Sequence, residues 1–227
     1  MAAGELRLAD AHQPLLRLVN DTERRVQVAA RFGLHRLGDK RFSHDLERTA
    51  RDRDTIVRAD TAIALGLLQE PSAVKVLREM QFDGNPSVRL QAAEALWRYG
   101  YEEALKTLVG ATVSAFADDQ AVAYLALAGP RNPRVLSHIH GGLTSDYTQI
   151  QLIAARAAGM LGSDAGYPIA VAGAKSPDAV QRALAAFALG AIGRTDAQGT
   201  LGQLIKDQDA DVRLAAATAV LQLKEGT

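Results

Sequence analysis

Apolar and small residues along this chain recur with a fixed period of 31 residues, without an insertion or a deletion. A constant period of about 20 to 50 residues is typical of solenoid proteins, in which each repeat buries its apolar face against its neighbours. The period therefore predicts a solenoid before any single motif is considered. It divides the sequence into seven rows, which begin at Val26, Val57, Val88, Asp119, Ile150, Gln181 and Val212.

Two apolar stripes at helical spacing run through the rows and predict two helices per repeat. The first, helix A, combines the first residue of a row with small residues four and seven positions later and a mostly leucine column eight positions later. The second, helix B, is marked by an aliphatic column twenty positions after the row start. The residues of this column are Leu46, Leu77, Leu108, Ile139, Ala170 and Leu201, with Leu15 in the same register upstream.

Turn residues separate the two stripes at constant positions. Glycine is favoured where a helix ends in a left-handed residue, and we expect helix A to end at Gly38, Gly100, Gly162 and Gly193. Asp and Asn side chains accept hydrogen bonds from the first free amides of a helix. We expect this role, the N-cap of helix A, for Asp54, Asn85, Asp178 and Asp209.

These signals predict an all-α fold, an α-solenoid of about fourteen helices without strands. Repeat 4 is irregular, because Asp119 takes the apolar first position and Pro130 the last core position of helix A. We expect this helix to end early, with a change of curvature or ordinary repeat drift as the consequence. We expect one solenoid over residues 1–227, with a half repeat 1–20, full repeats 21–51, 52–82, 83–113, 114–144, 145–175 and 176–206, and a terminal half repeat 207–227.

Three segments carry a resemblance to a known family. They are Asp52-Arg-Asp-Thr-Ile-Val57-Arg58, Asp83-Gly-Asn-Pro-Ser-Val88-Arg89 and Asp207-Gln-Asp-Ala-Asp-Val212-Arg213, each followed by an alanine-rich stretch. They resemble the short HEAT-like repeats of phycobilin lyases, and the resemblance covers about residues 10 to 224. It implies a helical solenoid but no single activity, because similar proteins include adaptors, lyase subunits and hydroxylases.

The resemblance also implies a ladder between repeats, formed by a turn aspartate and an arginine six residues later. The matching pairs would be Asp52 with Arg58, Asp83 with Arg89, and Asp207 with Arg213, and Arg182 would join the ladder although Ser176 precedes it. We expect these groups to be structural, through charge-assisted hydrogen bonds. Serine and glutamine occupy the two columns in repeats 4 and 5, which we expect to be held less firmly.

Helix B lines the concave face in HEAT-like proteins, and its outward positions predict the binding groove. These positions are charged in the first repeats and small or weakly polar in the later ones. They include His44, Glu47, Arg48, Lys75, Arg78, Glu79, Lys106, Val109, Ser137, His140, Val171 and Gln203. We expect a protein or peptide to bind there, oriented by charge. The alternative is that these charges are merely solvated.

The predicted function is therefore that of a non-enzymatic binding scaffold. The repeat type leaves two alternatives open, a subunit of a bilin (tetrapyrrole) lyase and a nucleic-acid-binding protein similar to alkylpurine DNA glycosylases. The chain has 26 Lys and Arg against 26 Asp and Glu. This balance gives no net positive field, so we expect no nucleic-acid partner.

No catalytic residue, cofactor or metal site is predicted. His138 and His140 are two positions apart and so lie on different faces of a helix. The His-Glu dipeptides that bind iron in HEAT-repeat hydroxylases do not occur in the sequence. The segment Gly173-Ala-Lys-Ser176 resembles the end of a phosphate loop, but it lacks the glycine before lysine and follows no strand.

Membrane insertion is not predicted, since no run of 18 apolar residues occurs, and the segment Met1–Asp10 lacks the layout of a signal peptide. We expect a soluble protein, cytoplasmic by default, although the absence of cysteine fits the periplasm equally well. The last helix A has apolar residues with no following repeat, so either the chain is part of a longer protein or its ends self-associate. These residues are Val212, Leu214, Ala216, Val220 and Leu223.

Two further features leave alternatives open. Trp97 stands in a column of mostly small residues, as a filler between repeats or as an anchor in an interface. Glycine inside a helix costs about 0.8–1.0 kcal/mol relative to alanine. Either a partner that approaches closely offsets this cost, or the B helices are shorter than the pattern suggests. The glycines in helix B are Gly141, Gly142, Gly173, Gly199 and Gly202.

Overall fold

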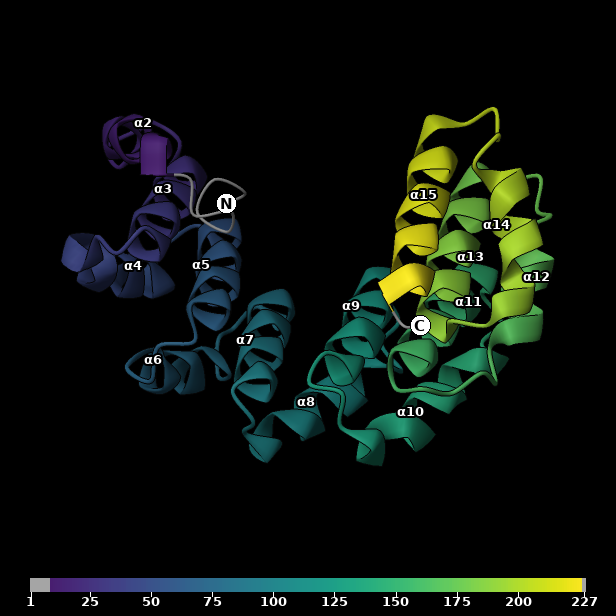
Figure 1. The fold of residues 1–227 in the computed structure, drawn as a ribbon. Coiled ribbons are helices and arrows are strands. Elements are labelled where there is room, and N and C mark those ends of the chain that lie inside the picture. Colours follow the sequence, from purple (N-terminus) through teal and green to yellow (C-terminus); the bar gives the residue numbers. More distant parts are fainter. Residues whose placement is uncertain (1–8, 226–227) are drawn as a thin grey trace. The chain divides into compact units, whose positions relative to one another are not determined.

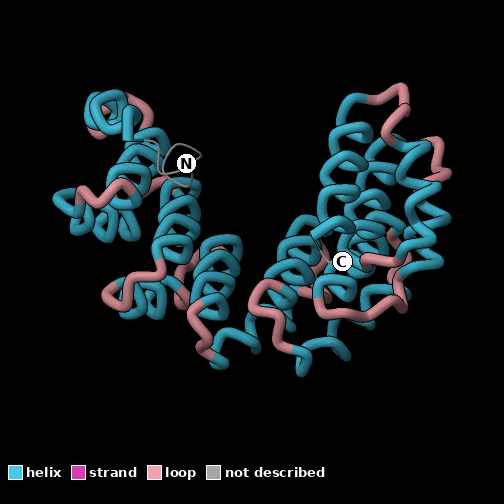
Figure 2. Tube along the Cα trace, viewed as in Figure 1, coloured by secondary structure: helices cyan, strands magenta, loops and turns pink. Residues whose placement is uncertain are grey.

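The computed structural model describes residues 9–225, which form fourteen α-helices joined by loops and short 3-10 turns, without a strand (Figure 2). The predicted all-α solenoid is confirmed. The chain divides into two compact units, residues 1–107 (unit 1) and 108–227 (unit 2). One continuous solenoid with the repeat boundaries given above stays a prediction, and residues 1–8 and 226–227 of its two half repeats lie outside the described residues.

The long helices are the predicted A helices, and each begins 31 residues after the one before. Side-chain caps mark four of these starts, since the side chains of Asp54, Asn85, Asp178 and Asp209 all accept hydrogen bonds from the first amides, as predicted. The A helices are α3 (Arg24–Arg36), α5 (Thr55–Leu68), α7 (Pro86–Arg98), α9 (Ala117–Ala128), α11 (Thr148–Met160), α13 (Ala179–Ile192) and α15 (Ala210–Glu225).

The B helices are much shorter, with six to eight residues in α4 and α6 against twelve to sixteen in α9 and α15. This supports the short-helix explanation for their glycines. The B helices are α2 (His12–Leu18), α4 (Ser43–Arg48), α6 (Ala73–Met80), α8 (Leu105–Ala111), α10 (Leu136–Gly141), α12 (Tyr167–Gly173) and α14 (Gln198–Leu204). A 3-10 turn, η3 (Thr49–Arg51), extends α4.

In unit 1, α3, α5 and α7 pack side by side, and α4 and α6 lie along one side of this row (Figure 1). The row-start residues Val57 and Val88 and the helix-B leucines Leu46 and Leu77 are fully buried, whereas Leu15 is half-buried. Trp97 is 2% exposed, so it fills the core and is not an exposed anchor.

In unit 2, α9, α11, α13 and α15 follow one another, α12 packs against α11 and α13, and α14 packs against α13 and α15 (Figure 1). Glycine allows the close approach of these helices. A Cβ on Gly159 would lie 2.7 Å from the backbone nitrogen of Ile192, and one on Gly190 would lie 2.7 Å from Cα of Ala219. Both distances are shorter than real Cβ contacts, so larger residues would push the helices apart.

The predicted glycine column behaves as expected, because Gly38, Gly100, Gly162 and Gly193 all have positive φ. Gln69 and Arg131 occupy the same column in repeats 2 and 4 and also have positive φ. The repeat geometry therefore imposes the left-handed residue even where the side chain disfavours it.

The irregular repeat 4 and the terminal helix α15 depart from the regular pattern in different ways. Helix α9 ends at Ala128, earlier in its row than any other A helix up to α13, as the prolines predicted. The expectation that the apolar residues of α15 are uncovered was partly wrong, since Val212 and Ala216 are fully buried. They pack into the core of α13 and α14, while Leu214 and Leu221 are exposed.

Candidate binding surfaces

The twelve predicted groove residues all lie on B helices and are exposed or half-exposed. The positions thus carry the expected solvent-facing side chains, while their concave placement stays a prediction. In unit 1 they are His44, Glu47 and Arg48 on α4, Lys75, Arg78 and Glu79 on α6, and Lys106 on α8. In unit 2 they are Val109 on α8, Ser137 and His140 on α10, Val171 on α12 and Gln203 on α14.

Ion pairs between successive repeats hold part of the charged face of unit 1. Arg51 donates to Glu79 at 2.6 Å, and Arg78 donates to Glu103 at 2.7 Å. The guanidinium of Arg78 also lies 4.7 Å from the centre of the Tyr101 ring. Because all four charged groups are about half exposed or more, each pair contributes at most about 1 kcal/mol. Their main effect is to orient these side chains.

Lys75 and Lys106 stand at equivalent positions of α6 and α8, 31 residues apart. Both are exposed, and neither forms an ion pair with another described residue. The unit 1 face therefore combines paired charges with two unneutralised cations.

The ladder connects repeats differently from the pairing that we expected. Arg58 donates to the carboxylate of Asp83, in the next repeat, at 2.7 and 2.9 Å, and only to the backbone oxygen of Asp52, at 2.8 Å. Arg182 binds Asp207 in the same way, at 2.8 and 2.9 Å. The guanidinium holds the pKa of Asp83 below its usual range.

Arg89 and Arg213, by contrast, donate only to backbone oxygens of the preceding turn among the described residues. Arg89 bonds to the carbonyls of Asp83 and Gly84, and Arg213 to those of Asp207 and Gln208. The three predicted Asp–Arg pairs therefore form through the backbone oxygen of the aspartate, and the carboxylate contact runs to the neighbouring repeat instead. An arginine six residues after the turn start reaches its own turn backbone in all four cases, and Arg58 and Arg182 also reach the carboxylate of the next turn.

Where glutamine replaces the ladder arginine, the local bond is kept. Gln27, Gln120 and Gln151 donate through Nε2 to backbone oxygens of their own turns at 2.6, 2.6 and 2.7 Å. A glutamine is too short to reach the next repeat as well. In repeat 1, Arg24 instead donates to Asp52.

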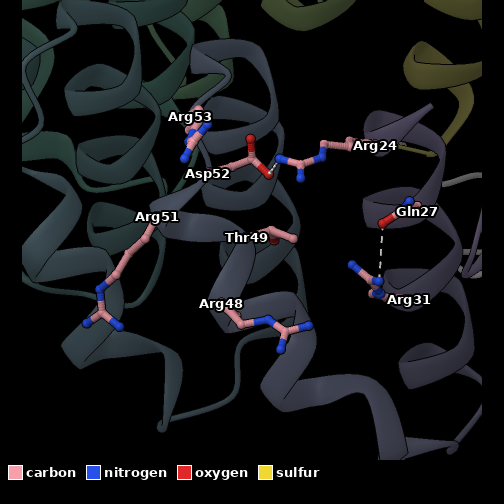
Figure 3. A pocket seen from close by; sticks show the side chains of 8 residues that line it. All are labelled: Arg24, Gln27, Arg31, Arg48, Thr49, Arg51, Asp52 and Arg53. Carbon is pink, nitrogen blue, oxygen red and sulfur yellow. Dashed lines mark hydrogen bonds and ion pairs between the residues drawn. The ribbon is translucent and has the colours of Figure 1, made fainter. Parts of the chain in front are cut away.

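An arginine-rich pocket lies between α3 and the α4–η3 segment of unit 1 (Figure 3). Its volume is about 420 Å³, and it is lined by Arg24, Gln27, Arg31, Arg48, Thr49, Arg51, Asp52 and Arg53. Figure 3 shows the side chains of Arg24, Arg31 and Arg48 directed into the space between the two segments, whereas Arg51 points away from it. The pocket therefore presents several cations and one carboxylate.

Arg31 is the buried residue of this pocket, with 9% of its surface exposed. Its Nη2 donates to the backbone oxygen of Val19 and to Gln27, both at 3.2 Å. Its Nε is buried and has no hydrogen-bond partner among the described residues, and no described carboxylate pairs with the side chain. Burial lowers the pKa of this guanidinium from its usual value.

In unit 2 the N-cap column carries aromatic residues in two consecutive repeats. Phe116 and Tyr147 occupy this position before α9 and α11, and neither side chain caps its helix. They are 69% and 64% exposed. The loss of a cap costs about 1 kcal/mol, so these exposed rings are not explained by helix stability.

The described part of the chain contains no group of three or more His, Asp or Glu side chains that could hold a metal. His140 forms a hydrogen bond with Ser163 at 3.0 Å. No helix within the described residues is long and apolar enough to span a membrane.

The model of the HEAT-repeat family matches residues 42–128 and 167–226, which is more than half of the chain. The chain belongs to the HEAT-repeat family. Membership agrees with the resemblance found in the sequence and with the helix pairs described above. No curated protein shows a significant sequence match.

Solved HEAT-like structures share this fold over most of the chain. The complex of CpcE and CpcF of phycocyanin lyase from Nostoc sp. PCC7120 matches with a TM-score of 0.63 and 19% identity, over 94% of this chain and 91% of that chain. YibA of Escherichia coli matches with a TM-score of 0.55 and 21% identity, over 83% of this chain and 73% of that chain. At these identities the likeness extends to the fold alone.

Two features of this HEAT-repeat chain were missed in the sequence, although each leaves a signal there. Arg31 stands five positions after a row start, where the other rows carry alanine or tyrosine, so a cation in a core column marks the pocket. Phe116 and Tyr147 stand where four other rows carry Asp or Asn. Both signals appear when each column is searched for its exceptions.

Proposed function

We propose that the chain is a non-enzymatic scaffold that binds a protein or peptide through the helix-B face of unit 1. The observation that carries this proposal is the pair Lys75 and Lys106, exposed at equivalent positions of consecutive B helices without an ion-pair partner among the described residues. Around them, the ion pairs Arg78–Glu103 and Arg51–Glu79 hold neighbouring charges in fixed orientations. Preoriented charges favour one docking geometry over others.

Exposed aromatic residues in unit 2 support protein binding independently. Phe116 and Tyr147 lie one repeat apart in a loop position where a cap would stabilise the helix. Aromatic side chains are enriched among the residues that dominate protein interfaces. A stability cost retained in two consecutive repeats fits selection for contact with a partner.

The C-terminal helix α15 offers a surface for self-association, the further partner expected from the sequence. Leu214 and Leu221 lie two turns apart on one face of the helix, and both are exposed. Two copies of α15 that met through this face would bury both leucines. A mass measurement by light scattering over a range of concentrations would detect such a dimer.

The proposed function is tested by capture of partners from an extract of the source organism, followed by quantitative mass spectrometry. The variant Lys75→Glu/Lys106→Glu reverses two charges on the proposed face. The matched control, Lys175→Glu/Lys206→Glu, reverses two exposed lysines that are also one repeat apart, in the turns before α13 and α15. We expect the amount of captured partner to fall about tenfold in the first variant and to stay unchanged in the control, because the two lysines become buried interfacial charges when the partner binds. Equal loss or retention in both variants would refute the proposed face.

A bilin lyase subunit is the second candidate, because the match to the phycocyanin lyase complex covers nearly the whole of both chains. This candidate predicts that the purified protein, alone or with a second HEAT-like subunit, binds a linear tetrapyrrole. The visible absorbance of an added bilin would then shift and sharpen on binding. An unchanged spectrum in both preparations would leave the scaffold function alone.

A further inference from the structure

We propose that the arginine-rich pocket of unit 1 is the subsite that receives an anionic side chain, a carboxylate or a phosphate, of the bound peptide. The proposal rests on the proposed function in that it names the chemistry of the partner. It locates the acidic group between α3 and the α4–η3 segment, at the point where Arg48 of the helix-B face also lines the pocket.

Arg31 is a buried cation without a direct anionic partner among the described residues. A buried charge without an opposite charge is expensive, and proteins normally pair it or bind an ion to it. Arg31 is 9% exposed, has an unpartnered Nε, and donates only to neutral acceptors, the backbone oxygen of Val19 and the amide oxygen of Gln27. The carboxylate of Asp45 acts on this guanidinium without a hydrogen bond to it and is ion-paired with Arg48. Gln27 also holds the turn through Asp21, so it is fixed in position beside the guanidinium. A ligand anion in the pocket would supply the missing charge.

Further arginines line the pocket around Arg31. Arg24 and Arg48 are largely exposed and reach into the same space from opposite sides (Figure 3). Each has one carboxylate neighbour, Asp52 and Asp45 respectively, which orients the guanidinium and leaves other N–H groups free to donate. Planar guanidinium groups match carboxylate and phosphate oxygens in pairs. The pocket thus has a buried anchor and two oriented donors at its mouth.

The shape and the remaining lining favour a peptide over a nucleic acid. A volume of about 420 Å³ holds one acidic side chain with part of its backbone. No aromatic residue lines the pocket for base stacking, and Asp52 lies on its wall. Equal numbers of acidic and basic residues in the chain provide no extended positive track for a phosphate backbone.

Fluorescence anisotropy tests the subsite with three labelled peptides of one frame, which carry a run of glutamates, glutamines or phosphoserines. We expect the glutamate or the phosphoserine peptide to bind, the stronger of the two identifying the anion, and binding to weaken as salt rises. The glutamine peptide should bind at least about tenfold more weakly, because it lacks the charge that Arg31 needs.

Substitutions separate the pocket from general electrostatics. Arg31→Gln should lower the affinity for the anionic peptide by about tenfold or more, and Arg48→Gln should lower it by about threefold. Arg48→Gln alters only an exposed side chain, so it keeps the test valid if Arg31→Gln disturbs the fold. Arg98→Gln, on α7, removes a half-exposed arginine from an i,i+4 pair with Glu94 and should change binding less than twofold.

Three results would overturn the subsite. The first is binding of the glutamine peptide as tight as that of the anionic peptides. The second is an affinity for the anionic peptide that is the same in Arg31→Gln, Arg48→Gln and Arg98→Gln. The third is tighter binding of a single-stranded oligonucleotide than of a peptide of the same charge. The outcome is independent of the partner-capture experiment, because Lys75 and Lys106 do not line the pocket. Capture that depends on these lysines, together with peptides that fail to bind, would reject the subsite and retain the scaffold.

Discussion

We predict that the contact between Arg58 of repeat 2 and Asp83 of repeat 3 stabilises the fold, and the residues at equivalent positions of other repeats suggest substitutions that test it. Arg58→Gln should keep the bond to the backbone oxygen of Asp52, since Gln27, Gln120 and Gln151 make this bond in their own turns. It removes the two bonds to the carboxylate of Asp83 and a longer bond, 3.2 Å, to the backbone oxygen of Arg53. Most of what the substitution removes is therefore the contact between repeats.

Asp83→Ser has the same property at the other partner. Oδ1 of Asp83 accepts a hydrogen bond from the amide of Asn85 at 2.8 Å. Serine at the equivalent position 176 keeps this turn bond through Oγ, which accepts from the amide of Asp178 at 3.1 Å. The two substitutions, alone and together, thus form a double-mutant cycle in which the local bonds survive.

The loss of unfolding free energy expected from these substitutions depends on how deeply the pair is buried. Hydrogen bonds to charged groups contribute about 1.5–3 kcal/mol, exposed ion pairs about 0–1, and the loss of one partner of a fully buried pair costs about 3–5. The side chains of Arg58 and Asp83 are 17% and 12% exposed, which places this pair between the last two cases. We expect each single variant to lose about 2–3 kcal/mol of unfolding free energy and the coupling energy to be about 2 kcal/mol.

Urea unfolding followed by the fluorescence of Trp97, the single tryptophan, reports on the neighbouring helix α7. The pKa of Asp83 is lowered in the folded state, chiefly by its hydrogen bond to Arg58. The coupling should therefore be complete above about pH 4, the unfolded pKa, and fall as the pH drops through the lower folded pKa. Arg89→Gln is the control, because Arg89 binds only backbone oxygens among the described residues, and its loss should stay below about 0.5 kcal/mol. A coupling below about 0.5 kcal/mol at neutral pH would refute this account of the ladder.

Two further predictions concern packing and pH. Gly159→Ala should destabilise unit 2 by about 1–3 kcal/mol, because the added Cβ would meet the backbone of α13. Gly202→Ala should stabilise unit 2 by about 0.8–1.0 kcal/mol, because the added Cβ would have nothing within 4 Å and alanine favours a helix over glycine. A thermal unfolding midpoint that moves in the same direction for both variants would contradict the packing argument. The hydroxyl of Tyr99 lies 3.0 Å from the backbone oxygens of Leu65 and Glu70, and burial raises its pKa to about 12. Because the folded pKa exceeds the unfolded value of about 10, the stability that Tyr99 contributes is complete below pH 10 and is lost as the pH rises towards 12. The difference in urea midpoint between the wild type and Tyr99→Phe, measured by circular dichroism, should shrink over this range, and a constant difference would show that the phenol is not held neutral.

The helices could be predicted from the sequence because the same capping and turn residues recur at equivalent positions of several repeats. Caps such as Asp54 and the glycines of the left-handed column locate the helix ends without any knowledge of tertiary structure. Even Gln69 follows the column, since neighbouring repeats fix the backbone there. Local signals that agree across seven rows leave little freedom for another register.

The sequence did not predict the partners of side chains across repeats. The family resemblance implied a pair between Asp52 and Arg58, but the carboxylate that this arginine reaches is that of Asp83, 25 residues later. Such a choice depends on the separation and twist of the stacked helices, which a one-dimensional pattern does not contain. The arginine pocket was missed for a related reason, because Arg31 on α3 and Arg48 on α4 meet only after helix A folds onto helix B.

The most direct test of the scaffold function is amide hydrogen exchange of the protein alone and in complex with its captured partner. Binding through the helix-B face of unit 1 predicts added protection of the amides in α4, α6 and α8, around Lys75 and Lys106, with the A helices α5 and α7 unchanged. Protection confined to other segments, with these B helices exchanging as in the free protein, would contradict the account.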